Sequence, residues 1–349
     1  MDIYTSISLN YLPKARILVQ SVKKFHPEWV VHLIISDRIQ EKDKSLSISF
    51  IKEYFDEVIW IEELDIENIY GWIFKHTVVE MCTALKGPYL QKLVKEGAKK
   101  IIYLDPDIAV FNSLDPLADL LDDHAILLTP HLVDYPDNNE SILENEIRGA
   151  LRHGIFNLGF FAVNAQKDDG KRFASWWGEH LRDYCYADYN LGLFTDQKWC
   201  DLVPAYFEDL HIVRDPGYNT ASWNIDKRHM SISKNGQILV NDKYPLRFYH
   251  FTGYDSGAGI RMTQQFSSGN QVVNEIWGWY DQQLMENRQK IVGNQKWFYD
   301  YYDNGIRITD DDRRLYRQRK DLQDTFPNPF KTNGTGKKNF FALYHNSLA

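Results

Sequence analysis

Residues 101–107 of the chain read Ile-Ile-Tyr-Leu-Asp-Pro-Asp, an apolar run that ends abruptly in two carboxylates one residue apart. Such a run is typical of a buried strand, and the end of a strand is where an α/β sheet usually places its chemistry. Asp105 and Asp107 repel each other, and a divalent cation that prefers oxygen ligands, Mg²⁺ or Mn²⁺, would relieve the repulsion. The alternative is a simple turn, in which Pro106 fixes the backbone between the acids. The spacing alone leaves both interpretations open.

Strand and helix patterns alternate before this stretch. Three β-prone runs precede it, at residues 2–8, 30–36 and 57–61. A helix that starts near Pro13 separates the first two runs, and strands joined in this way imply a parallel sheet with right-handed crossovers. A helical stretch over residues 78–96, with a break expected at Gly87-Pro88, leads into the strand that ends at Asp105.

The alternation continues towards the C-terminus. Four more strands are expected, at residues 125–129, 160–163, 238–240 and 246–250. Four more helices are expected, at residues 116–121, 170–183, 274–288 and 310–320. Asp115 and Thr309 are the predicted caps of the first and last of these helices. Residues 186–235, rich in Asn, Asp, Gly and Pro, predict irregular loops over a site, and the tail from Phe326 is predicted to be weakly structured.

These patterns predict an α/β fold with a mainly parallel central sheet flanked by helices. The length of 349 residues suits one large domain or two ordinary ones. We expect an α/β domain of the nucleotide-binding type over residues 1–260 and a smaller helical extension over residues 261–349 that packs on it.

The composition argues against several classes of protein. A formal net charge of −8 disfavours general nucleic-acid binding, which needs a basic surface. The three cysteines are odd in number and widely spaced, which fits a reducing compartment. No signal-peptide pattern is present, and the apolar runs are too short to span a membrane. We therefore expect a cytoplasmic protein with at most peripheral membrane association, for which Lys331, Lys337 and Lys338 are the candidate contacts.

Polar residues also stand at the ends of other apolar runs. Asn157 and Gly159 precede a buried strand, where a glycine permits close approach of a ligand and an asparagine can hydrogen-bond hydroxyl groups. Asp196 follows Thr195, and His250 ends a strand. Ordinary structural explanations exist for each: a turn, a helix cap at Thr195, and a core or surface histidine. Two carboxylates and one imidazole nevertheless make up part of a ligand shell that suits Mn²⁺.

Aromatic residues make up 14% of the chain, a content found in proteins that bind sugars and also in proteins with a large core. Residues 217–224 alternate aromatic rings with amide side chains. That combination suits a sugar, and it equally suits a packed loop.

With these segments in this order, the chain resembles the retaining, glycogenin-like GT-A glycosyltransferases of family 8, which include bacterial lipopolysaccharide galactosyl- and glucosyltransferases. The matching segments are the opening residues 2–11, Asp105-Pro106-Asp107 as the D-x-D motif, Asn157-Leu158-Gly159 to Asn164, the pair Asp196-Gln197, and His250 to Gly253 as the H-x-x-G motif. The resemblance implies a GT-A, Rossmann-like fold: a central mixed, mainly parallel sheet flanked by helices, with a helical C-terminal extension.

The resemblance also implies roles for individual residues. The implied ligands of Mn²⁺ or Mg²⁺ are Asp105, Asp107 and His250. The implied catalytic residues are Asn157, Asp196 and Gln197, with the first two at the donor sugar and Gln197 against its reacting face. The implied donor-binding residues are Thr5, Ser6, Ser8 and Asn10 at the base and ribose, Lys86 at the phosphates, and also Asp105 and Gly253.

Two positions depart from the family pattern. Ser8 stands where the group usually carries an acid that contacts uracil. Ser256-Gly257-Ala258 stands where the group has Lys-Pro-Trp, so the lysine that steadies the leaving diphosphate is missing. Arg261 or Lys86 would have to replace it.

The implied activity is metal-dependent transfer of a hexose from a nucleotide-diphosphate sugar, expected to be a UDP-sugar, to a glycan, lipid-linked or protein acceptor with retention. One alternative is a metal-dependent phosphohydrolase or nucleotidyltransferase, which should offer more carboxylates for a second metal. The other is a non-catalytic carbohydrate-binding protein of the same fold, and the intact set of Asp105, Asp107 and His250 argues against it. No nucleic-acid partner is expected.

Overall fold

The computed structural model describes residues 1–38, 51, 53–333 and 339–345. Lys337 and Lys338, two of the candidate surface contacts, lie outside these residues. Among the helices of the described part, none combines the length and the apolar composition that a bilayer crossing requires.

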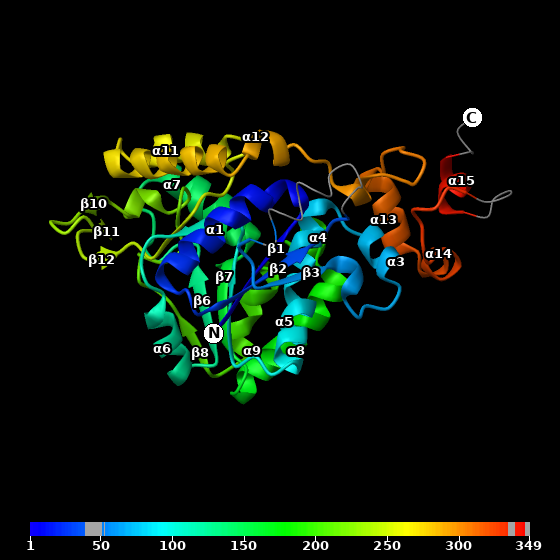
Figure 1. Ribbon diagram of the computed structural model, residues 1–349, viewed down its shortest axis with the longest axis horizontal. Helices are drawn as coiled ribbons and strands as arrows, with labels where there is room; N and C mark the ends of the chain where they lie inside the picture. The colour runs from blue at the N-terminus through cyan, green and yellow to red at the C-terminus, as the bar shows by residue number, and fades with distance from the viewer. Residues whose placement is uncertain (39–50, 52, 334–338, 346–349) are drawn as a thin grey trace.

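A seven-stranded sheet forms the centre of the molecule (Figure 1). Its strands lie in the order β3 (Glu57–Trp60), β2 (Val30–Ile35), β1 (Asp2–Ile7), β4 (Lys100–Leu104), β7 (Phe156–Asn164), β6 (Ile126–Pro130) and β8 (Leu210–Ile212). Within this sheet only β7 runs antiparallel to its neighbours. The predicted architecture, a mixed and mainly parallel sheet flanked by helices, is therefore confirmed.

Helices cover both faces of the sheet. One face carries α1 (Leu12–Phe25) and α6 (Asp115–Asp123), and the other carries α4 (Val78–Ala84), α5 (Lys86–Lys95) and α8 (Asp168–Tyr184). Successive residues of β4 point into opposite cores, Ile102 and Leu104 towards α1 and Ile101 and Tyr103 towards α5 and α8. β1 and β4 are parallel, so their carboxyl ends lie at the same edge of the sheet.

Two smaller sheets contain the remaining strands of the described residues. The first contains β5 (Ile108–Val110), β13 (Phe248–His250) and β9 (Thr220–Ala221), and it starts where β4 ends. The second contains β10 (Met230–Ile232), β11 (Ile238–Val240) and β12 (Tyr244–Pro245). The first of these sheets brings distant parts of the sequence to the end of β4.

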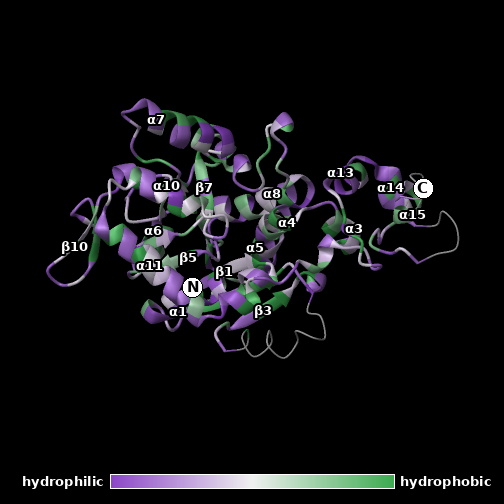
Figure 2. Ribbon diagram, turned by 90° about the horizontal axis from the view of Figure 1, so that it is seen from above, coloured by the Kyte–Doolittle hydropathy of each residue, from purple (hydrophilic) through white to green (hydrophobic). Residues whose placement is uncertain are grey.

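Residues after 260 pack against the rest of the chain in two places. α10 (Ala258–Phe266) and α11 (Gln271–Glu286) bury Trp277 and Tyr280 against Phe251 and the α1 side chain Ile17. α13 (Asp310–Gln318), α14 (Lys320–Thr325) and α15 (Phe340–His345) pack near α3 (Ile69–Phe74). Figures 1 and 2 place α13, α14 and α15 at the opposite end of the molecule from α11. The division at residue 260 stays a prediction.

At two helix starts the structure replaces the expected break or cap with a different arrangement. The break before β4 falls at Leu85, not at Gly87-Pro88, because Pro88 lies in the first turn of α5, where its missing N–H has no intrahelical partner to lose. Asp115 is the first residue of α6 and not its cap. The N–H of Asp115 donates instead to the Ser113 hydroxyl (3.0 Å).

The C-terminal part agrees with the sequence at one point and departs from it at another. Thr309 caps α13 as predicted: its hydroxyl accepts from the N–H of Asp312 (3.1 Å), and the Asp312 carboxylate accepts from the N–H of Thr309 (3.0 Å). The prediction of a weakly structured tail is wrong for the described residues up to 345, because Phe330 and Phe340 are buried in the core that contains Phe74.

Candidate metal centre

A tight turn between β4 and β5 positions the two aspartates. The N–H of Asp105 donates to the carbonyl of Gly159 on β7 (2.8 Å), and the N–H of Ile108 donates back to the carbonyl of Asp105 (3.0 Å). β5 then pairs antiparallel with β13, with Ile108 opposite His250. The strand register therefore delivers His250 beside the turn that carries Asp107.

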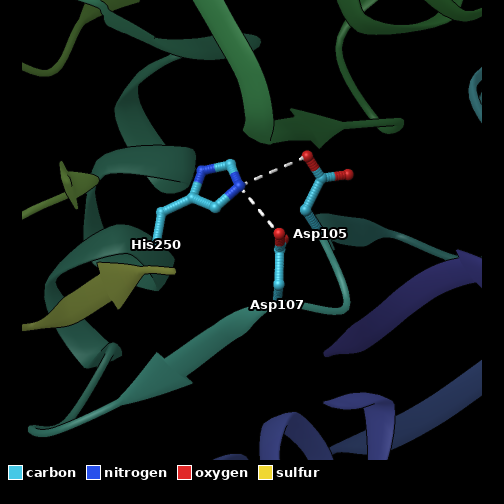
Figure 3. Close-up of side chains that lie close together, drawn as sticks. All are labelled: Asp105, Asp107 and His250. Atoms are coloured by element: carbon cyan, nitrogen blue, oxygen red, sulfur yellow. Dashed lines mark ion pairs between the residues drawn. The ribbon is translucent and has the colours of Figure 1, made fainter. Parts of the chain in front are cut away.

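The three side chains converge on one point (Figure 3). Nε2 of His250 lies 3.1 Å from Oδ1 of Asp107 and 3.7 Å from Oδ2 of Asp105. One ligand atom from each residue lies within 4.8 Å of the other two, and Asp107 and His250 are buried. The structure thus brings together all three predicted metal ligands, and their role as ligands stays a prediction.

Burial and charge act in opposite directions on this group. Burial alone would lower the pKa of His250, but the adjacent Asp107 carboxylate raises it above its ordinary value of 6.5. Burial would raise the pKa of Asp107, but His250 and then Lys14 lower it below 3.8. Negative charge is therefore favoured at Asp107, as a cation site requires.

A residue that the sequence did not single out as a positioning group orients the imidazole. Nδ1 of His250 lies 3.2 Å from Oδ1 of Asn219, which fits a proton on Nδ1 and leaves Nε2 to face the carboxylates. The Asn219 amide donates to the Asn157 side chain (2.9 Å) and to the Thr129 hydroxyl (3.0 Å). Asn219 has a φ of +49°, a conformation that asparagine tolerates better than most residues. The alternation of rings and amides around it suits a sugar or a packed loop and does not signal this role.

A buried lysine links the aspartates to Asp196. Nζ of Lys86 lies 2.7 Å from Oδ2 of Asp196 and 3.2 Å from Oδ1 of Asp105, and it donates to the carbonyl of Leu158 (2.9 Å). Burial alone would lower the pKa of Lys86, but the two carboxylates raise it above its ordinary value. The Tyr103 hydroxyl donates to the same oxygen of Asp105 (2.7 Å). Lys86 therefore lies at the site, already paired with two acids.

The Asp196-Gln197 pair lies in a loop with an unusual backbone. Thr195 has a φ of +46°, and its hydroxyl donates to Oδ1 of Asp196 (3.0 Å). The explanation of Thr195 as a helix cap is wrong, because the next helical turn starts at Lys198 without a side-chain cap. The Gln197 amide donates to the carbonyl of His153 (3.1 Å). The structure joins Asp196 to Asp105 through Lys86, whereas the Gln197 side chain is hydrogen-bonded to the segment before β7.

The predicted nucleotide-binding residues lie on β1 and just after it. Thr5 and Ser6 are buried within the strand, and the Ser6 hydroxyl donates to the carbonyl of Cys82 (2.8 Å). The Ser8 hydroxyl donates to Oδ1 of Asn10 (2.6 Å) at the carboxyl end of β1. Gly253, with a φ of +70°, lies in the loop that follows β13. Their contacts with a nucleotide stay predictions.

An acid that sequence reasoning missed lies beside this strand end. Asp37 follows β2, and its carboxylate accepts from three backbone N–H groups: Leu9 (3.3 Å), Arg38 (2.9 Å) and Phe298 (2.9 Å). Burial raises the pKa of Asp37 to about 6 despite these hydrogen bonds. Asp37 thus ties the loop after β1 to the C-terminal extension, and no local pattern in the sequence signals this contact.

The sequence profile of glycosyl transferase family 8 matches residues 2–235 of the chain. The chain belongs to this family. The matched range contains Asp105, Asp107, Asn157 and Asp196 and ends before His250. The predicted class, a glycosyltransferase, is confirmed at the level of the family.

Relatives and solved structures with similarity to the chain add the following comparisons. Two proteins of Bacillus subtilis (strain 168) are each 28% identical to the chain. The match to the uncharacterized protein YfnF extends over 179 residues and covers 50% of this chain and 57% of YfnF. The match to the uncharacterized protein YfnD extends over 190 residues and covers 51% of this chain and 55% of YfnD. The chain thus spans about half the length of the curated relatives that it matches. The galactosyltransferase LgtC, in a crystal structure with donor and acceptor sugar analogs, is 17% identical, with 80% of this chain and 100% of LgtC covered and a TM-score of 0.43.

Proposed function

We propose that this chain transfers a hexose from a nucleotide-diphosphate sugar, expected to be a UDP-sugar, to a glycan, lipid-linked or protein acceptor in a metal-dependent reaction with retention. The observation that carries the proposal is the convergence of Asp105, Asp107 and His250 within 4.8 Å in a family 8 chain. The buried Lys86 and Asp196 adjoin this cluster, so that charged groups of both signs line one site.

The chemistry of the three side chains fits a divalent cation. Two carboxylates and one imidazole are ligands that Mn²⁺ accepts readily, and Mg²⁺ accepts the oxygens. Asn219 occupies Nδ1 of His250, so Nε2 remains as the ligand atom. A cation bound there would neutralise the negative charge that builds on the departing diphosphate.

The residues around the cluster have distinct proposed roles. Lys86 fixes the Asp105 and Asp196 carboxylates relative to each other through its ion pairs. Asp196 and Gln197 stabilise the oxocarbenium-like centre of the sugar, and Asn157 hydrogen-bonds its hydroxyl groups. Retention follows when the acceptor hydroxyl attacks from the face that the diphosphate leaves. The loops over residues 186–260 exclude water and so protect the donor from hydrolysis.

The same proposal includes the setting of the reaction. Ser8 and Asn10 contact the nucleotide at the end of β1, and residues 261–349 contribute to acceptor binding. We place the reaction in the cytoplasm, supported by Cys82, Cys185 and Cys200, all of which are free thiols.

A donor screen tests the proposal. The protein is incubated with UDP-, GDP- and dTDP-sugars, with Mn²⁺ or with EDTA, and the release of nucleoside diphosphate is followed. We expect nucleoside diphosphate to be released from one class of donor with Mn²⁺ and not with EDTA. This release should be lost in Asp107→Asn. Asp119→Asn, on the exposed side of α6, is the matched control and should keep full activity.

Three outcomes would contradict the proposal. Release of monophosphate or orthophosphate would indicate the hydrolase or nucleotidyltransferase alternative. Sugar binding without turnover and without metal would indicate a carbohydrate-binding protein. Full activity in Asp107→Asn would show that the three residues are not the metal site.

A further inference from the structure

Lys14 is a buried cation that the proposed mechanism leaves without a role. It lies in the first turn of α1, and its side chain is 1% exposed. Its ammonium forms an ion pair with the carboxylate of Asp255 and lies 3.6 Å from the centre of the Tyr11 ring. A lysine is rarely buried to this extent without a functional or strongly paired partner.

The partner of Lys14 comes from a loop with a tightly packed base and an exposed tip. Asp255 lies between Gly253 and Gly257, which have φ values of +70° and +67°. A Cβ on Gly253 would lie 2.8 Å from the N of Gly259, so the base of the loop is tightly packed. The Asp255 side chain, in contrast, is 44% exposed. The buried member of the ion pair is therefore on α1, and the exposed member is on the loop.

Lys14 is also connected to the proposed metal ligands through this loop. The loop leaves β13 directly after His250, and the N–H of Phe251 at its start donates to the carbonyl of Asp107 (2.8 Å). The Lys14 ammonium lies 5.8 Å from the centre of the Tyr254 ring on the same loop. A diphosphate held at Asp107 would bring its negative charge towards the same ammonium.

We infer that Lys14 binds the diphosphate of the donor, and that the Asp255 carboxylate occupies the place of a phosphate group until the donor arrives. The inference rests on the proposed function, because it needs a diphosphate at the metal centre. It also accounts for the missing lysine after the H-x-x-G motif, since the cation comes from α1 instead. Arg261 is exposed, and its guanidinium donates to the carbonyl of Ser256 (3.3 Å).

This exchange of anions predicts opposite effects for the two members of the pair. Lys14→Met removes the cation and should weaken diphosphate binding about tenfold or more, the effect of losing one charge-assisted hydrogen bond. Asp255→Asn removes the competing anion and should strengthen diphosphate binding several-fold. An ion pair that only supports the fold would give weaker binding, or no change, in both variants.

The test measures binding of inorganic pyrophosphate and of UDP to the full chain with Mn²⁺ by calorimetry. Lys23→Met and Asp56→Asn form the matched control, because these residues make an ion pair of 2.8 Å at the other end of α1. Both control variants should bind like wild type. Thermal unfolding of every variant, followed by circular dichroism, separates loss of fold from loss of binding.

The results distinguish this inference from the proposed function. Wild-type protein that binds neither probe in the presence of Mn²⁺ would overturn both. Wild-type binding with unchanged affinity in Lys14→Met, or weaker binding in Asp255→Asn, would overturn the inference alone. A loss of affinity in Arg261→Gln but not in Lys14→Met would assign the role to the exposed arginine.

Discussion

The orienting contact of Asn219 gives a quantitative test of the candidate site. Asn219→Gly removes the side chain but keeps the backbone free to adopt a φ of +49°. The change deletes hydrogen bonds to His250, Asn157 and Thr129. At about 1 kcal/mol for each, the free energy of unfolding without metal should fall by about 3 kcal/mol. Loss of a partner that orients a metal ligand typically weakens metal binding by about 10–100-fold, and we expect this range for Mn²⁺.

A second substitution at the same position separates the side chain from the backbone. Asn219→Ala should weaken Mn²⁺ binding as much as Asn219→Gly, and it should unfold about 1 kcal/mol more easily because alanine is strained at positive φ. Asn241, which is exposed and has a φ of +53°, provides matched Gly and Ala controls. Those controls should differ from each other in stability and should leave Mn²⁺ binding unchanged.

Both quantities are measured on the same samples. Mn²⁺ affinity comes from electron paramagnetic resonance of the free ion, and the free energy of unfolding comes from urea titration in EDTA. Mn²⁺ affinity within twofold of wild type in Asn219→Gly would refute the reasoning, since Nδ1 of His250 would then need no partner. Equal stability of the Gly and Ala variants would refute the backbone part of the argument.

Three further predictions concern the same centre. Asp107→Asn should reduce turnover by more than about 100-fold while the melting temperature in EDTA stays close to that of Asp119→Asn, and a large drop in that temperature would show a structural role instead. Gly159→Ala would place a Cβ 2.4 Å from Cε1 of His250, so it should lower the free energy of unfolding by about 1–3 kcal/mol and weaken Mn²⁺ binding. Wild-type stability and Mn²⁺ affinity in this variant would mean that the close approach of Gly159 to His250 is unimportant. Burial lowers the pKa of His131 from 6.5 to about 4, so the folded state favours the neutral ring. The stability that the neutral ring contributes is present above pH 6.5 and is lost as the pH falls towards 4. In urea titrations this loss should reach about 3 kcal/mol, and it should shrink in His131→Gln.

The parts of the site that the sequence predicted are those with a local signal. The apolar run before Asp105 predicted both a buried strand and the position of the acids at its end, and β4 has these bounds to within one residue. His250 was predicted from the end of another apolar run, and its meeting with Asp107 required only that the motifs occur in the family order. The direction of β7 had no such signal, because all nine of its residues are buried and give no alternation to read.

The residues that sequence reasoning missed depend on tertiary contacts. Asn219 can contact the His250 imidazole because β9 pairs with β13 and brings the asparagine beside it. Lys14 reads as an ordinary helical lysine until Asp255 is seen next to it. No pattern within a window of the sequence contains both members of either pair.

The carboxylate of Asp37 has a practical consequence for anyone who shortens this protein. A truncation before residue 298 would take away one of its three N–H donors and open a buried acid to partial hydration. The turn at Leu9 shares that carboxylate, so the cut would also disturb the backbone at the end of β1, far from it in the sequence. We expect a trimmed version to lose the proposed nucleotide affinity although Asp105, Asp107 and His250 are all still present.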